Sequence, residues 1–377
     1  MTYIYVTENN LTIAMHIKKI FLFITTVAVI AISACKKDSN AINNNNNTTG
    51  KKDTTSTPTK KSGTYVYVAG NVTSSLSVPV ATYWANGKAH ALADSTSESY
   101  AYAIATADTN VYIAGIAHNA ATYWKNSVAT ALINGSMALG ITVSGSDVYV
   151  AGVSNLNGTN VATYWKNGTA ITLTDDLTPS VAVSIVVSGG DVYVAGYLAA
   201  AGNINTVCYW KNGAIQNVST TSTSTFGNSS FGSIGLAVAG SDVYITGAVE
   251  NGTDTQVIAT LWKNGTPTSL TTDGDKISSA ANAILVSGAT VYVAGYDDNV
   301  ATYWINGTAY QLNSNAQQYM ATSIAVSSDV YAVGGNDVYV SGFSGYSTTN
   351  AVYWKNGNLV TLSTRNSTTC GIGIVKY

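Results

Sequence analysis

DVYVAGVSNLNGTNVATYWKNG, residues 147–168, is the stretch that decides the fold, because both halves of it recur along the chain. The first half is an apolar segment that ends in glycine. Its seven copies are YVAG at 67–70, YIAG at 112–115, YVAG at 149–152, YVAG at 193–196, YITG at 244–247, YVAG at 292–295 and YVSG at 339–342. A segment that recurs at a near-constant interval predicts one structural unit per copy.

The second half follows each copy of the first and carries all seven tryptophans of the chain. These are Trp84, Trp124, Trp165, Trp210, Trp262, Trp304 and Trp354. Intervals of about 40 to 50 residues are typical of propeller blades built from four strands. The sequence therefore predicts an all-β protein, a seven-bladed β-propeller of four-stranded blades.

One repeat shows how a blade is expected to divide into strands. The expected strands cover 182–188, 192–197, 207–211 and 215–218. The turn at Asn212 and Gly213 is the strongest short hairpin signal, because a type I′ turn needs positive φ at both central residues. The strands are apolar on both sides, as expected for sheets covered on both faces by their neighbours.

The two ends of the repeat region predict how the ring closes. Residues 64–70 resemble a second strand with no first strand before it, and residues 371–376 resemble a first strand with no second strand after it. Together they complete one blade and remove the free sheet edges. In one copy, either 324–327 or 330–333 could be the inner strand, and both readings stay open.

The pairing of a VYVAG strand with a Tyr-Trp strand resembles kelch-type propellers and bacterial propeller repeats with a VYVxG core. The double glycine of kelch repeats is reduced to a single one here, as at Gly152 and Gly196. The resemblance implies the propeller fold and transfers no site residue.

The amino-terminal region predicts export and lipid attachment. Two lysines precede an apolar run, 20–32, which is too short to span a bilayer. It ends in Ile32-Ser33-Ala34-Cys35, which resembles the lipobox of bacterial lipoproteins and implies that Cys35 is acylated. The alternative is a membrane anchor with an incidental cysteine. Met15 would make a normal signal start.

The residues after Cys35 extend this interpretation. Lys36-Lys37-Asp38 resembles the tract that directs Bacteroidetes lipoproteins to the outer membrane surface. We therefore expect a signal peptide at 1–35, a disordered polar tether at 36–62 and the propeller at 63–377. The expected location is the outer membrane, at the cell surface and attached by lipid.

The charge of residues 63–377 argues against polyanionic partners. Nine basic side chains stand against sixteen acidic ones, which leaves a net charge of about −7. The lysines are dispersed along the sequence and form no basic stripe. This argues against nucleic acid and against docking on anionic lipid through the propeller itself. We expect a monomer.

Most candidate catalytic or metal-binding residues have a structural explanation. His90 and His118 lie at unlike positions of different repeats, and Cys208 and Cys370 are expected to be buried, unpaired thiols. Four aspartates, at 147, 191, 242 and 337, precede Val-Tyr strands and are expected to bond backbone amides of turns. No catalytic residue and no cofactor are predicted.

Three acidic pairs in variable loops are candidate ligands of a calcium ion. These pairs are Asp175 with Asp176, Asp273 with Asp275, and Asp297 with Asp298. They lack the full spacing of a known calcium loop, and solvated carboxylates are the plainer interpretation.

The tryptophans are expected to fill the space between adjacent sheets, so ligand stacking is sought among aromatic residues outside the repeat. The ligand-binding candidates are Tyr197, Phe226, Phe231, Tyr296, Phe343 and Tyr346. The other aromatic residues outside the repeat are Tyr100, Tyr102, Tyr310 and Tyr319. The loops between strands two and three and between strands four and one vary, and they are expected on one side of the ring. Such a face is where recognition is usually placed.

Three functions follow from this interpretation. The first is a non-catalytic surface lipoprotein whose propeller binds a glycan or protein ligand. The second is a propeller-fold hydrolase or lyase, which would need ionisable residues at the channel mouth. The third is a structural role in an envelope assembly.

Overall fold

The chain divides into two units, Met1–Lys61 and Ser62–Tyr377, and the fold described below belongs to the second. The computed structural model describes residues 63–199, 205–218, 234–251, 256–271, 278–312, 319–327, 336–345 and 349–376. Cys35 and the tether at 36–62 lie outside these ranges. No described segment forms a helix long and apolar enough to span a bilayer.

The described strands form seven four-stranded antiparallel sheets, which confirms the predicted propeller. Blade 1 contains β28 (Ser367–Lys376), β1 (Thr64–Thr73), β2 (Pro79–Ala85) and β3 (Lys88–Ala91); blade 2 contains β4 (Ser99–Ala107), β5 (Asn110–Ala117), β6 (Ala120–Lys125) and β7 (Val128–Ala131). Blade 3 contains β8 (Gly135–Ser144), β9 (Asp147–Leu156), β10 (Thr159–Lys166) and β11 (Thr169–Thr172); blade 4 contains β12 (Ser180–Ser188), β13 (Asp191–Ala199), β14 (Asn205–Lys211) and β15 (Ala214–Asn217).

The remaining three blades have the same strand order. Blade 5 contains β16 (Gly235–Ala239), β17 (Asp242–Asn251), β18 (Gln256–Lys263) and β19 (Thr266–Ser269). Blade 6 contains β20 (Ser279–Ser287), β21 (Thr290–Asp297), β22 (Val300–Ile305) and β23 (Thr308–Gln311); blade 7 contains β24 (Tyr319–Ser327), β25 (Asp337–Ser344), β26 (Asn350–Lys355) and β27 (Asn358–Thr361). Residues 324–327 thus belong to the inner strand, and the alternative at 330–333 lies outside the described residues.

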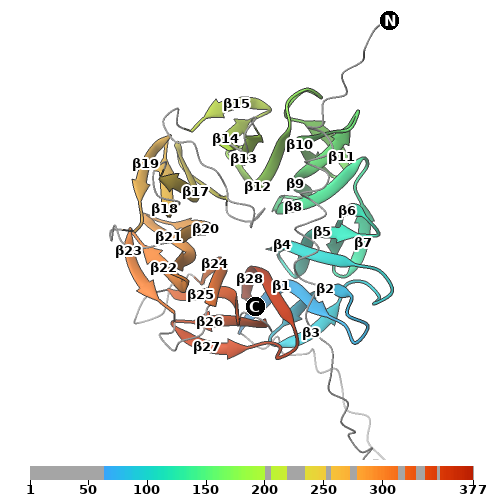
Figure 1. Ribbon diagram of the computed structural model, residues 1–377, viewed down its shortest axis with the longest axis vertical. Helices are drawn as coiled ribbons and strands as arrows, with labels where there is room; N and C mark the ends of the chain where they lie inside the picture. The colour runs from blue at the N-terminus through green and yellow to red at the C-terminus, as the bar shows by residue number, and fades with distance from the viewer. Residues whose placement is uncertain are drawn as a thin grey trace, which may run out of the picture. The chain divides into compact units, whose positions relative to one another are not determined.

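The first strand of each blade contacts the first strands of both neighbouring blades, and Figure 1 shows these inner strands around the centre of the ring. The ring closes as expected, because β1 pairs with β28 from Thr64 opposite Lys376 to Val72 opposite Ser367. Every described strand pairing lies between Thr64 and Lys376. All the strand partners of the described strands therefore lie within the second unit, Ser62–Tyr377.

The turn between the third and fourth strands is built in the same way in every blade. In blade 3, Asn167 has φ 51° and Gly168 has φ 84°, as a type I′ turn requires. The side-chain oxygen of Asn167 accepts a 2.9 Å hydrogen bond from the amide of Val148 in the second strand. The equivalent asparagines are Asn86, Asn126, Asn212, Asn264, Asn306 and Asn356, each bonded to the second strand of its own blade.

Each tryptophan fills the junction between its own blade and the preceding one, which confirms the predicted role. All seven are at most 1% exposed. Trp165 of blade 3 packs in one cluster with Tyr112, Ala114 and Ala121 of blade 2. Serine hydroxyls add polar links at four junctions, as where Ser180 accepts a 2.8 Å hydrogen bond from the amide of Ala162. Apolar area and buried hydrogen bonds therefore both join the blades.

In six of the seven blades, the described inner strand has a β-bulge beside the glycine that ends the repeat motif. In blade 4, the register between β12 and β13 shifts between Ala182 and Ser184, so Val183 is the extra residue. A Cβ added at Gly196 would collide with the carbonyl oxygen of Val181. The bulge brings the two backbones too close for any side chain, so glycine is required there.

We expect Gly196→Ala to lower the free energy of unfolding by about 1–3 kcal/mol, because the added methyl must displace backbone. Urea denaturation followed by circular dichroism measures this loss. Gly63→Ala is the matched control, since nothing lies within 4 Å of a Cβ there. Equal midpoints for the two variants would contradict the bulge explanation.

Candidate functional site

The strand order gives the propeller two different faces. The connections from strand one to two and from strand three to four lie on one face, which we call the short-turn face. The connections from strand two to three and from strand four to one lie on the opposite face, which we call the long-loop face. The predicted placement of the variable loops on one side follows directly from this topology.

Three of the predicted ligand-binding aromatics occupy one repeated position on the long-loop side. Tyr197, Tyr296 and Phe343 each follow the glycine of the second strand, in blades 4, 6 and 7. The other blades have Asn71, Ile116, Val153 and Ala248 at this position. The position is thus variable on an otherwise constant scaffold. Phe226, Phe231 and Tyr346 lie outside the described residues.

These three aromatics are half-buried and do not form an open stacking platform. Tyr197 packs against the core cluster that contains Val181 and Val207, and burial raises the pKa of its hydroxyl. The hydroxyl of Tyr296 lies 3.4 Å from that of Ser278. Tyr100 stacks on Tyr102, with ring centroids 6.1 Å apart. Among the described residues, Tyr310 is the one strongly exposed aromatic at 43%, and it lies on the outer strand β23.

The apolar side chains that do project from the long-loop face are aliphatic. Leu76, Ile133 and Leu177 are 68%, 68% and 83% exposed, and each lies in a loop of this face. They were not predicted from the sequence, where only aromatic residues were proposed as ligand contacts. The available signal was a single aliphatic residue among polar loop residues, as in Asp175-Asp176-Leu177-Thr178.

The acidic pairs proposed as calcium ligands lie far from one another in the structure. Asp175 accepts a hydrogen bond from the amide of Leu177 at 3.2 Å, and its pKa is lowered chiefly by the hydroxyl of Thr178. Asp176 accepts one from the side-chain amide of Asn157 at 2.8 Å. Asp297 and Asp298 lie three blades away, at the end of β21 and in the turn after it.

Asp273 and Asp275 lie outside the described residues. No group of three or more His, Cys, Asp or Glu side chains in the described part of the propeller could hold a metal ion. Each described pair would have to bind calcium with backbone or water oxygens as the remaining ligands.

The histidines and cysteines do not converge on a site. His90 stacks on Tyr83 on the outer side of blade 1, with centroids 4.9 Å apart. His118 lies in a tight turn of blade 2, and its Nδ1 is 3.3 Å from the hydroxyl of Ser97. Cys208 and Cys370 are free thiols, as expected, and burial raises the pKa of each to about 12. Neither thiol is activated as a nucleophile.

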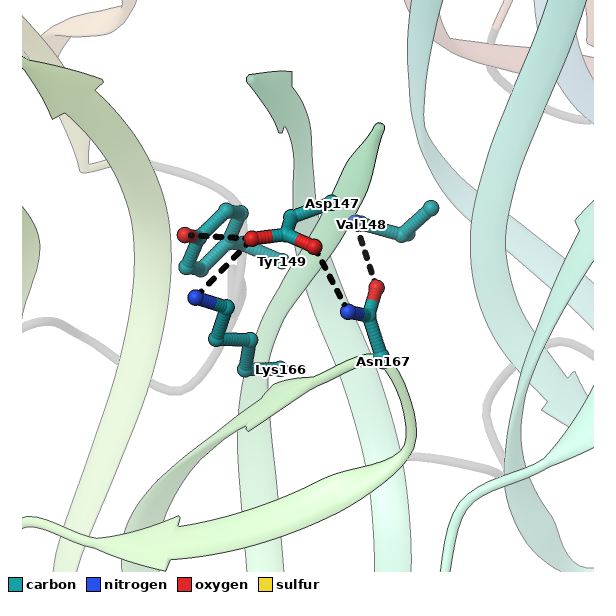
Figure 2. Close-up of polar contacts among 5 residues, drawn as sticks. All are labelled: Asp147, Val148, Tyr149, Lys166 and Asn167. Carbon is teal, nitrogen blue, oxygen red and sulfur yellow. Dashed lines mark hydrogen bonds and ion pairs between the residues drawn. The ribbon is translucent and has the colours of Figure 1, made fainter. Parts of the chain in front are cut away.

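The short-turn face carries a polar cluster that recurs in four of the seven blades, shown for blade 3 in Figure 2. Asp147 forms a 2.9 Å ion pair with Lys166 and accepts a 2.8 Å hydrogen bond from the side-chain amide of Asn167. The ammonium of Lys166 lies 5.3 Å from the ring centroid of Tyr149. Equivalent ion pairs join Asp191 to Lys211, Asp242 to Lys263 and Asp337 to Lys355, each at 2.8 Å.

This cluster corrects the expected role of the four aspartates. The acceptor for the backbone amide of the second strand is the asparagine of the following turn, and the aspartate instead holds that asparagine and a lysine. The hydrogen bond from Lys166, followed by that from Asn167, lowers the pKa of Asp147. The same bond raises the pKa of Lys166, so the pair stays ionised at neutral pH.

Comparisons with known proteins find only distant structural similarity. No protein-family model matches the chain, and no curated protein is similar to it. Among solved structures, oligopeptidase B from Trypanosoma brucei is 12% identical with a TM-score of 0.42, over 81% of this chain and 48% of that one. This chain therefore spans about half the length of that peptidase.

Two further structures are similar at the same low level. A neuraminidase-like protein from A/bat/Guatemala/164/2009 is 9% identical with a TM-score of 0.43, over 67% of this chain and 86% of that one. A GH32 β-fructofuranosidase from Bombyx mori is 8% identical with a TM-score of 0.32, over 73% and 89%. Identities this low carry no residue roles across to this chain.

The described inner strands are poor in charged residues. The seven inner strands contain no Asp, Glu, His or Arg, and their one lysine, Lys376, is at the very end of β28. The other residues of these strands are mostly Ala, Val, Ile, Ser and Thr, with Tyr100, Tyr102, Tyr319 and Cys370 among them.

Proposed function

We propose that this protein is a lipid-anchored envelope protein whose propeller is a non-catalytic binding module, with the ligand on the long-loop face. The observation that carries this proposal is the contrast between the two faces. The short-turn face repeats one polar cluster, whereas the long-loop face varies at every blade and exposes Leu76, Ile133 and Leu177. Variable loops on a rigid scaffold are the usual place for recognition.

Of the two ligand classes, the described side chains favour a protein over a glycan. Exposed aliphatic residues suit the apolar centre of a protein interface, whereas sugars are bound by exposed aromatic faces. The described aromatics of this face, Tyr197, Tyr296 and Phe343, are half-buried. A glycan site would depend on Phe226, Phe231 and Tyr346, which lie outside the described residues.

The anchoring part of the proposal rests on the sequence around Cys35. Acylation there would attach the propeller to the outer membrane through the tether at 36–62. Labelling of cells with a fatty-acid analogue should mark the wild-type protein and leave Cys35→Ala unmarked. Equal labelling of the two proteins would remove the lipid from the proposal.

The test of the binding face uses two charge-neutral triple variants. Leu76→Ser, Ile133→Ser and Leu177→Ser change the long-loop face. Val128→Ser, Ile215→Ser and Leu359→Ser, exposed apolar residues on the outer strands at 70%, 44% and 40%, are the control. Crosslinking on intact cells should give a specific adduct that the first variant loses and the control keeps. Loss from both variants, or from neither, would contradict this location.

A glycan array probed with the propeller, with and without calcium, tests the other ligand class. We expect no specific hit in either condition. A hit that disappears when Phe226 and Phe231 are replaced by Ala would establish a carbohydrate ligand instead, and a calcium requirement would direct attention to the acidic pairs. A blank array together with no crosslink would favour the structural role.

A further inference from the structure

Charged side chains are segregated between the two faces of the propeller. All seven lysines whose positions the structure describes are exposed and lie at the short-turn face: Lys88, Lys125, Lys166, Lys211, Lys263, Lys355 and Lys376. The described acidic residues of that face are Asp108, Asp147, Asp191, Asp242 and Asp337. Seven lysines against five aspartates leave an excess of two positive charges there.

The long-loop face has the opposite balance. Its described acidic side chains are Asp94, Glu98, Asp175, Asp176, Asp297 and Asp298, and Arg365 is the one basic side chain described there apart from the histidine His118. Asp297 is buried, so five solvent-accessible carboxylates against one guanidinium leave an excess of four negative charges among the described side chains. Among the described side chains, positive charge therefore predominates on the short-turn face and negative charge on the long-loop face, although the net charge of the propeller is negative.

The first strand of the propeller begins on the face that carries the lysines. β1 begins at Thr64, opposite Lys376 at the end of β28, and both positions belong to the short-turn face. The chain that leads back to Cys35 is therefore covalently attached on the lysine side. Lipid docking was not expected from the sequence, because residues 63–377 have a negative net charge and dispersed lysines. The fold gathers the described lysines on one face, while the net charge stays negative.

We propose that the short-turn face docks on an anionic phospholipid surface and that the long-loop face thereby points away from it. This orientation rests on the proposed function, because it would present the binding loops outward from the anchoring membrane. The lysine excess attracts lipid headgroups and the carboxylates of the other face are repelled by them. Surface charges act within a Debye length, about 8 Å at physiological salt, so the nearer face dominates.

The lysines are partly neutralised by the aspartates, and this suggests a gain-of-binding test. Asp147→Asn, Asp191→Asn, Asp242→Asn and Asp337→Asn together would free four lysines. The substitution is compatible with the cluster, because blade 2 already has Asn110 at this position, bonded to the side-chain amide of Asn126 at 2.7 Å. A matched variant, Asp94→Asn, Glu98→Gln, Asp175→Asn and Asp176→Asn, changes the net charge equally on the other face.

The experiment is co-sedimentation of the propeller, residues 63–377, with vesicles of phosphatidylcholine alone or with one third phosphatidylglycerol. Each added positive charge at an anionic surface strengthens binding about fivefold. We expect the short-turn variant to bind the anionic vesicles at least about tenfold more tightly than wild type, and added salt to reverse the gain. The long-loop variant should gain less than about twofold, and neutral vesicles should bind none of the three.

Equal gains for the two variants would show that net charge alone matters and would overturn the proposal, as would no gain for the short-turn variant. Thermal melts of both variants confirm that each is folded before the comparison. The result is independent of the binding-face tests, because vesicles contain no protein or glycan ligand. Failure of either proposal can therefore be recognised while the other stands.

Discussion

A chain truncated after Asn366 should lose its cooperative unfolding transition. The deletion removes β28, which pairs with β1 along its whole length and places Ile372 in a cluster with Val66, Val68 and Trp84. Without it, β1 becomes an exposed inner edge and the first and seventh blades lose their shared packing. An unpaired, apolar strand edge also promotes aggregation.

Differential scanning calorimetry and size-exclusion chromatography measure this outcome. The control is a circular permutant that joins Tyr377 to Gly63 through a short linker and opens the chain between Gly189 and Gly190. A Cβ at either glycine would meet nothing within 4 Å, so new ends fit there. The permutant keeps every strand pairing and should melt cooperatively. A truncated protein that melts like wild type would show that ring closure does not stabilise the fold.

Trp165→Ala should lower the free energy of unfolding by about 3–5 kcal/mol, the usual loss for a buried aromatic side chain. Trp165 is fully buried between blades 2 and 3, in contact with Ala121 and Leu132. Its indole N–H also donates a 3.1 Å hydrogen bond to the carbonyl oxygen of Ile133, which lies in a loop of the long-loop face. The substitution therefore leaves a cavity and releases that loop.

Urea denaturation followed by circular dichroism measures the loss. Tyr310→Ala, a change at a 43% exposed aromatic, is the control and should shift stability by less than about 0.5 kcal/mol. Similar midpoints for the two variants would mean that the tryptophans do not stabilise the blade junctions. A normal midpoint for Trp165→Ala together with weakened ligand crosslinking would instead assign Trp165 to recognition.

Local patterns predicted most of the architecture. The repeat interval predicted the number of blades, and the Asn-Gly pairs predicted the turns, since positive φ is a property of the residues in the turn itself. The missing strands at the two ends predicted the pairing of β1 with β28. The burial of Trp84, Trp165 and Trp354 followed from their constant place in the repeat.

The exposure of the candidate site residues could not be predicted from local patterns, because it depends on side chains of neighbouring strands and loops. Tyr197 was proposed as a ligand contact, but Val181 and Val207 cover it. Leu177 was not proposed, yet it is 83% exposed. The Asp147 turn was identified, but its partner Lys166 was not, because the pair meets only through the register between β9 and β10.

The sequence by itself determined the strands, the turns, the seven repeats and the way the ring closes, because each is encoded by neighbours along the chain or by copy number. The tertiary structure decided the segregation of charge. Lys125 and Lys166 are about 40 residues apart in the sequence. Both lie on the same face because the third strand of each blade ends at that face. Strand direction and register, which no local pattern specifies, convert a dispersed set of lysines into a surface.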